Sequence, residues 1–221
     1  MKRQEISQET SAKPLFFIEA DNIVSGIIDM YGHTMTNVGD LFQATSYDGI
    51  NCISYKRSTN LPKYLLNETI YPLTIIFNIY RTSTSGHGGI FALWTGNQVS
   101  TARQTGLASS RGGNNFILGE HLPGMSYSNS SQAVQINDYQ WYNVICVVNG
   151  NSYKLYLDGE LKKEITLSAS IDNTTIQTLV FGHPYNTANN QLNGAIRKFM
   201  LLDKKLSQSE IQYYYNLTKV I

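Results

Sequence analysis

The alternation of apolar and polar side chains predicts an antiparallel β-meander in the second half of the chain. Residues 142–148 form an apolar run rich in β-branched side chains, and a turn signal of Asn and Gly follows it. Apolar and polar positions then alternate through 153–157, the period of a strand with one buried face. An Asp-Gly hairpin signal leads into a third strand over 160–166. We therefore expect three antiparallel strands joined by tight turns.

A short helix is predicted near the C-terminal end of the sequence. Ser207 and Glu210 have the spacing of a capping box, in which each side chain binds the backbone N–H of the other residue. Ile211 and Tyr214 follow at helical spacing, within a run of three tyrosines. We expect about two to three turns of helix that end near Asn216, with the tyrosines packed on a sheet.

A series of short motifs extends this pattern over most of the chain. In chain order they are Asp29–Gly32, Tyr47–Gly49, Leu73–Phe77, Trp141, Tyr156–Gly159, Gly182, Asn193–Ile196 and Leu206–Ile211. Their order and spacing, over roughly residues 15–217, resemble those of the laminin-G-like (concanavalin A-like) jelly-roll domains. The resemblance implies an all-β fold of two antiparallel sheets packed face to face, with jelly-roll connections and the C-terminal helix. It also implies a chain that binds sugars, binds proteins or builds a surface.

Length and composition fit a single domain with a polar arm. A chain of 221 residues suits one large β domain, and no linker divides it. We expect residues 14–221 to form one laminin-G-like sandwich and residues 1–13 to precede it as an arm. The segment 103–131 is rich in Gly, Ser and Asn, and it is expected to form long loops at one edge of the sandwich.

Charge and hydropathy exclude several kinds of partner. A net charge of +1 argues against binding to nucleic acid or to an anionic membrane. No apolar run has the length of a membrane span. The basic start of the sequence has no apolar core behind it, so we expect no signal peptide.

Two cysteines, Cys52 and Cys146, fall inside predicted strands. We expect both to be buried free thiols, while a disulfide stays open if their strands pair. Their low number and the missing export signal favour folding in a reducing cytoplasm.

The arm, residues 1–13, is polar, mixed in charge and without a strand or helix period. Such a segment does not fold by itself, so it either packs on its own domain or docks onto a neighbouring chain. We expect docking through Lys2, Arg3 and Ile6, because linear arms commonly link the subunits of virus particles. The partners would be other virion or assembly subunits, and the chain would be part of an oligomer.

Catalytic and metal-binding groups are not predicted. Glucanases of this fold carry an E-x-D-x-E-like cluster that supplies a nucleophile and an acid. The nearest segment here, Glu19–Asp21, lacks the third acid, so we expect no enzyme and no catalytic residue. The four His lack metal-ligand spacing. We expect no cofactor, but Ca²⁺ at the loop acids Asp138 and Asp172 stays open, because some family members hold Ca²⁺ at the sandwich rim.

A sugar-binding site needs an exposed aromatic ring, on which the sugar ring can stack, and polar side chains on nearby loops. Trp94 ends a predicted strand just before such loops, whereas Trp141 opens a core strand and is expected to pack in the core. The alternative for Trp94 is a core or subunit contact. The candidate ligand-binding residues are Trp94, Asn97, Arg103, Arg111, Asn114 and Tyr127.

These observations favour a non-catalytic structural and display module on a virion surface, such as a phage head or tail, that binds host cell-surface glycans through its loops. The many Asn, Ile, Tyr and Lys residues are typical of an AT-rich genome, as in a microbe or its virus. The first alternative is a free lectin or adhesin that is extracellular or on the cell surface. The second alternative is a glycan-active enzyme, which would place two carboxylates in one cleft.

Overall fold

The structure, a computed structural model, describes residues 14–20, 42–55, 63–69, 72–82, 90–94, 106–112, 115–120, 134–167, 175–181 and 192–221. Its elements are β1 (Pro14–Glu19), β2 (Phe42–Tyr47), β3 (Ile50–Tyr55), β4 (Lys63–Thr69), β5 (Leu73–Arg81), β6 (Phe91–Trp94), β7 (Gly106–Gly112), β8 (Asn115–Glu120), β9 (Val134–Gln135), β10 (Trp141–Asn149), β11 (Ser152–Leu157), β12 (Glu160–Thr166), β13 (Thr175–Phe181), β14 (Gly194–Leu202) and α2 (Gln208–Thr218). Within these ranges no helix is long and apolar enough to cross a membrane.

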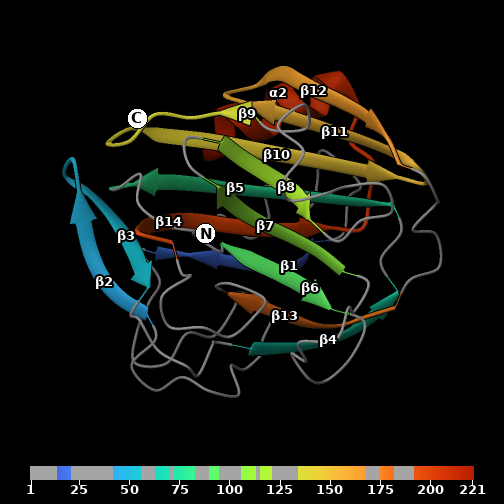
Figure 1. Cartoon of the computed structure of the whole chain (residues 1–221), viewed down its shortest axis with the longest axis horizontal. Helices are drawn as coiled ribbons and strands as arrows, with labels where there is room; N and C mark the ends of the chain where they lie inside the picture. The colour runs from blue at the N-terminus through green and yellow to red at the C-terminus, as the bar shows by residue number, and fades with distance from the viewer. Residues whose placement is uncertain are drawn as a thin grey trace.

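The described strands form two sheets that lie face to face. The larger sheet has the order β12-β11-β10-β5-β14-β3-β2, and β1 also pairs with β14. The smaller sheet has the order β4-β13-β6-β7-β8-β9. In Figure 1 the smaller sheet lies in front of the larger one, and α2 lies behind β10 and β11. The predicted all-β sandwich with a C-terminal helix is confirmed.

The predicted meander is strands β10, β11 and β12, each antiparallel to the next. Asp158 and Gly159 join β11 to β12, and both have positive φ, at 50° and 79°. Two successive positive φ values are what a type I′ turn requires. The turn between β10 and β11 uses Gly150, with φ of 65°. Local turn chemistry therefore sets the register of this half of the larger sheet.

Phenylalanine rings fill the space between the sheets. Phe199 of β14 lies 5.0 Å from Phe91 of β6 and 4.9 Å from Phe181 of β13, measured between ring centroids. Phe77 of β5 contacts Phe91 in the same edge-to-face manner at 5.5 Å. All four rings are fully buried. Burying each ring contributes about 1.5–3 kcal/mol, so this group is the centre of the sandwich.

The other face of the larger sheet is covered by α2. All nine residues of β5 are buried, so its outward side chains also need a cover. Ile76 of β5 packs with Ile211 and Tyr214 of the helix. The capping box is present: the N–H of Glu210 donates to the Ser207 hydroxyl, and the Glu210 carboxylate accepts from the Ser207 N–H. The predicted helix is confirmed, and it ends two residues beyond Asn216, at Thr218.

Both cysteines are free and buried, as the sequence predicted. Burial raises the pKa of Cys52 to about 11, and burial also raises the pKa of Cys146. Thiols with raised pKa values are poor nucleophiles at neutral pH, so both act as small apolar side chains.

A buried ion pair closes the end of β5. The Arg81 side chain is 2% exposed, and its guanidinium binds the Asp138 carboxylate and donates to the Ile136 carbonyl oxygen at 3.0 Å. The backbone N–H of Tyr139 donates to the Arg81 carbonyl oxygen at 2.7 Å. These bonds fix the segment 136–139 against β5.

Loss of the Asp138 carboxylate should leave the buried guanidinium without its counter-charge. We expect Asp138→Ala to lower the free energy of unfolding by about 3–5 kcal/mol, measured by urea denaturation. The double variant Arg81→Met, Asp138→Ala also removes the guanidinium charge that has no counter-charge. It should recover most of the lost free energy of unfolding. A single-variant loss below about 1 kcal/mol would contradict the role given to the pair.

Gly194 should not tolerate a side chain. A Cβ at this position would overlap the carbonyl oxygen of Tyr80 and lie 2.9 Å from the Arg81 Cα, and backbone cannot move aside easily. We expect Gly194→Ala to lower the free energy of unfolding by about 3 kcal/mol or more. Gly49→Ala is the matched control, because a Cβ there meets nothing within 4 Å and carries only the strain of a φ of 76°, about 1–2 kcal/mol. Equal losses for the two variants would show that the close approach is relieved by backbone movement.

Candidate functional site

The residues predicted to bind sugar fall largely outside the described part of the chain. Asn97, Arg103, Asn114 and Tyr127 lie outside it, as do the arm residues Lys2, Arg3 and Ile6 and the Ca²⁺ candidate Asp172. Trp94 and Arg111 are described by their backbone. Trp94 closes β6 and pairs with Gly106 of β7, five residues before Arg111 in the same strand. Their backbones are therefore about 17 Å apart along β7, and the structure does not bring these two together.

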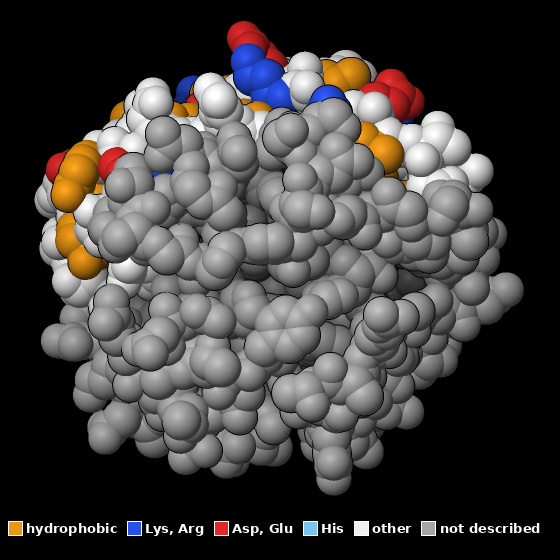
Figure 2. Space-filling model, in the orientation of Figure 1, with side chains coloured by type: hydrophobic (Ala, Val, Ile, Leu, Met, Phe, Trp, Pro, Cys, Tyr) orange, Lys and Arg blue, Asp and Glu red, His pale blue; other side chains and the backbone are white. Residues whose placement is uncertain are grey.

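Three aromatic rings, Tyr47, Tyr80 and Trp141, meet at one end of the larger sheet, and Tyr139 lies close enough to affect the Tyr80 phenol electrostatically. We call these four residues the aromatic cluster. Tyr47 ends β2 and stacks on Tyr80 of β5, with ring centroids 4.8 Å apart and planes 11° apart. Tyr80 also contacts Trp141, which opens β10, at 5.2 Å. In Figure 2 hydrophobic side chains reach the surface at the left rim, where Figure 1 places the turn between β2 and β3.

Trp141 lies on the outer face of the larger sheet, and the prediction that it packs in the core is wrong. Its neighbour Tyr142 is the residue that faces the sandwich core, with Val144 next on the same side. Side chains alternate across a strand, so Trp141 shares its face with the polar Asn143. Trp141 is half-buried there. The polar residue at 143 was the sequence signal for this register.

One residue of the aromatic cluster, Tyr139, is exposed to solvent. Tyr80 is 5% exposed, whereas Tyr139 is 68% exposed. Tyr139 also has a positive φ of 58°, which a bulky residue adopts only when its surroundings hold it. Its N–H bond to Arg81 and the adjacent Asp138–Arg81 ion pair supply that hold. The backbone of Tyr139 is therefore fixed before any ligand arrives, with its side chain exposed to solvent.

A carboxylate stands beside the rings. Asp48 is exposed in the turn between β2 and β3, and it forms a side-chain hydrogen bond with the Tyr80 hydroxyl. The pKa of Tyr80 is raised first by burial and then by the Asp48 charge, with smaller effects from Tyr47 and Tyr139. The phenol therefore stays protonated and donates to Asp48, which leaves the second carboxylate oxygen able to accept from a ligand.

Buried polar groups lie next to the cluster on the same face. Trp141 Nε1, both polar atoms of the Asn78 amide and the Asn143 oxygen have no hydrogen-bond partner among the described residues. Asn78 and Asn143 are directly paired across β5 and β10, and the Asn143 amide nitrogen donates to the Thr218 hydroxyl at 2.8 Å. Ordered water normally satisfies groups of this kind. The rings thus adjoin a polar layer at the C-terminal end of α2.

The cluster offers no evident place for a metal ion. Among the described residues no group of three or more His, Cys, Asp and Glu is close enough to hold one. Asp138, a Ca²⁺ candidate, already binds the buried Arg81 guanidinium.

Similar structures share this fold. Domain 4 of AbnA, an extracellular arabinanase of Geobacillus stearothermophilus solved with arabinotriose, is 14% identical with a TM-score of 0.62, and the match covers 94% of this chain and 99% of that domain. The receptor-binding domain of botulinum neurotoxin D is 21% identical with a TM-score of 0.64, covering 92% of this chain and 52% of that one. Trypanosoma rangeli sialidase, in complex with a difluorinated nononic acid, is 12% identical with a TM-score of 0.64, covering 90% of this chain.

This chain spans 32% of the sialidase and about half of the toxin domain. No curated protein sequence matches it significantly. The family model for the concanavalin A-like lectin/glucanases superfamily, Laminin_G_3, matches residues 56–212. That range includes both the meander and the start of α2, so the chain belongs to the laminin-G-like family of the concanavalin A-like lectin and glucanase superfamily.

Proposed function

We propose that the chain is a carbohydrate-binding module that holds a sugar ring against the aromatic cluster. The observation that carries the proposal is Tyr139, a residue that is 68% exposed while its backbone is held by the Arg81 carbonyl and lies next to the Asp138–Arg81 pair. The C–H face of a sugar stacks on such a ring, and a nearby carboxylate accepts hydrogen bonds from hydroxyls. Asp48 supplies that carboxylate. A backbone fixed in advance lowers the entropy lost on binding.

The similar structures support this choice of ligand class. Domain 4 of AbnA, which this chain matches over nearly its whole length, was solved with arabinotriose. The larger proteins that contain a similar fold include a sialidase. Oligosaccharides are therefore the first ligands to test.

Binding without hydrolysis is part of the proposal. Glycoside hydrolysis uses two carboxylates about 5–10 Å apart, one of them as an acid. Among the described residues two acids adjoin the cluster, but Asp138 is 13% exposed and bound to Arg81. Of these two, Asp48 alone can reach a ligand, and one carboxylate suits recognition better than catalysis.

We extend the proposal to the place of the chain, which is the surface of a virion. In this account the arm, residues 1–13, docks onto another subunit and the sandwich presents its sugar site outward. The arm lies outside the described residues, so this part is supported by its polar sequence.

Removing the exposed ring should weaken sugar binding without unfolding the protein. With arabinotriose and a printed glycan array as probes, we expect Tyr139→Ala to reduce affinity about tenfold for the best ligand, about 1.4 kcal/mol. Leu161→Ala is the matched control, because Leu161 is also a large exposed hydrophobic residue, at 47%, but lies on β12. Isothermal titration calorimetry measures both. Binding by Tyr139→Ala equal to that of the unchanged protein, or no glycan bound at all, would contradict the proposal.

The arm should control assembly and leave sugar binding intact. Light scattering on the full chain and on a form that lacks residues 1–13 measures the mass of each in solution. We expect the full chain to form a defined oligomer and the shortened form to be a monomer that binds sugar equally well. Two monomers would remove the display role and leave a free lectin.

A further inference from the structure

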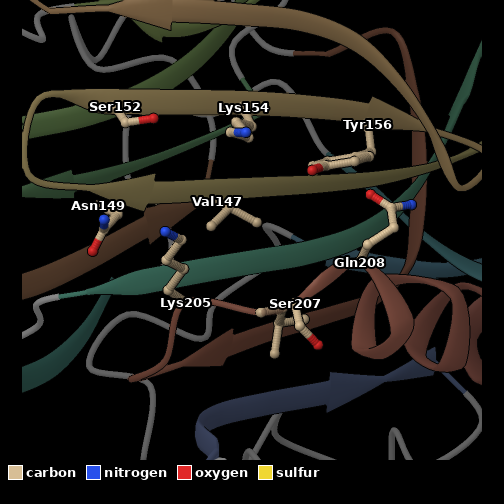
Figure 3. A pocket seen from close by; sticks show the side chains of 9 residues that line it. Val147, Asn149, Ser152, Lys154, Tyr156, Lys205, Ser207 and Gln208 are labelled. Atoms are coloured by element: carbon tan, nitrogen blue, oxygen red, sulfur yellow. The ribbon is translucent and has the colours of Figure 1, made fainter.

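A recess on the outer face of the larger sheet, the face that also carries the aromatic cluster, lies at the N-terminal end of α2. It is a pocket of about 210 Å³ lined by Val147, Asn149, Ser152, Lys154, Tyr156, Lys205, Leu206, Ser207 and Gln208. Figure 3 shows β10 and β11 on one side of it and the segment that leads into α2 on the other, with Lys205 extending toward β10. Val147, Tyr156 and Leu206 are buried and form its apolar floor. Polar side chains form the rest of the lining.

The charge balance of this lining is positive. Among the described residues that line the pocket there are two lysines and no acid. Lys154 is paired with Glu164 of β12 at 3.0 Å, and that hydrogen bond raises the pKa of Lys154, so it stays charged. Lys205 is exposed and forms no ion pair within the described part of the chain. A positive charge without a partner thus stands over an apolar floor.

The nearest acid on the helix side is already engaged. The Glu210 carboxylate accepts from the Ser207 N–H at 2.8 Å and also binds Lys204. The Lys204 charge therefore balances the Glu210 charge. An incoming anion would meet the amino group of Lys205 with the hydroxyl of Ser152 and the amide of Gln208 around it, whereas the Ser207 hydroxyl already donates to the Glu210 carboxylate.

From this arrangement we propose that the pocket binds the acidic end of a small organic ligand: one ring that carries a carboxylate, with the carboxylate at Lys205 and the ring over Tyr156. The volume sets the size, because it is below the roughly 300–1,000 Å³ of pockets that enclose drug-sized molecules. The ring packs against the apolar floor, and the charge-assisted hydrogen bonds orient the anion. A uronic acid has this form.

This pocket is separate from the aromatic cluster. Trp141 and Val147 point to the same face of β10 and are six residues apart, about 20 Å along the strand. α2 lies between the two sites, since it begins at the pocket and its Thr218 reaches Asn143. The inference does not depend on the proposed function, because each site can be altered without touching the other.

The test is an NMR titration of the full ¹⁵N-labelled chain with two matched probes, methyl glucuronide and methyl glucoside, which share a ring and differ in the carboxylate. We expect the glucuronide to shift the amide signals of Ser152, Lys154, Ser207 and Gln208, with a Kd at least about tenfold lower than that of the glucoside. Lys205→Gln should raise the glucuronide Kd about tenfold. Lys162→Gln, which removes an exposed lysine on β12, should change it less than about twofold.

Three results would overturn the inference. Equal binding of glucoside and glucuronide would show that the carboxylate is not recognised. An equal loss in Lys162→Gln and Lys205→Gln would show general charge attraction only. Sodium sulfate that binds as tightly as the glucuronide, with the same shifts, would show an adventitious ion only, with no part for the ring. Tyr139→Ala should leave glucuronide binding unchanged, so failure of the sugar site at the aromatic cluster is distinguishable from failure here.

Discussion

Burial of β5 on both faces is the constraint on which the rest of this structure depends. Its odd positions, such as Phe77, fill the sandwich between the two sheets. Its even positions, such as Ile76, face away from the sandwich and would expose apolar surface to water without a further layer. The helix α2 is that layer, and Ile211 and Tyr214 supply its apolar face. The fold therefore needs its last helix as much as it needs its second sheet.

The helix is shorter than the sheet that it covers, and both candidate sites follow from this difference. Eleven residues of helix span about 16 Å, whereas the nine residues of β10 span about 30 Å. The helix therefore does not cover the two ends of the outer face, and other side chains cover them. At one end aromatic rings cover the sheet, and Tyr47 closes over Tyr80. At the other end the polar segment before the helix leaves a pocket with Lys205 at its edge.

The two ends differ in what they can recognise. The aromatic cluster presents a flat apolar ring with a carboxylate beside it, which suits a neutral sugar. The pocket presents a lysine with no acid in its lining, which suits an anion. The Arg81–Asp138 pair links the first site to the core, because the same residues that end β5 hold Tyr139. Stability and recognition therefore share one set of contacts at that end.

The sequence predicted those parts of the fold that depend on near neighbours. The turn at Asp158 and the capping box at Ser207 are local signals, and both formed as expected. The aromatic cluster was missed because Tyr47 and Trp141 both contact Tyr80 of β5. No local pattern shows that β10 pairs with β5, or that the end of β2, three strands away in the sheet, reaches back to Tyr80. Trp141 was assigned to the core because β10 is apolar on both faces. Apolar and polar residues therefore alternate only weakly along it, and only Asn143 and the terminal Asn149 mark its outer face.

The crystal structure of the chain with its tightest-binding oligosaccharide tests the central claim most directly. The account predicts one sugar ring stacked flat on Tyr139, with a hydroxyl that donates to the Asp48 carboxylate and little movement of the segment 136–139. A sugar bound on the loops that follow Trp94, with the Tyr139 ring free in solvent, would contradict it.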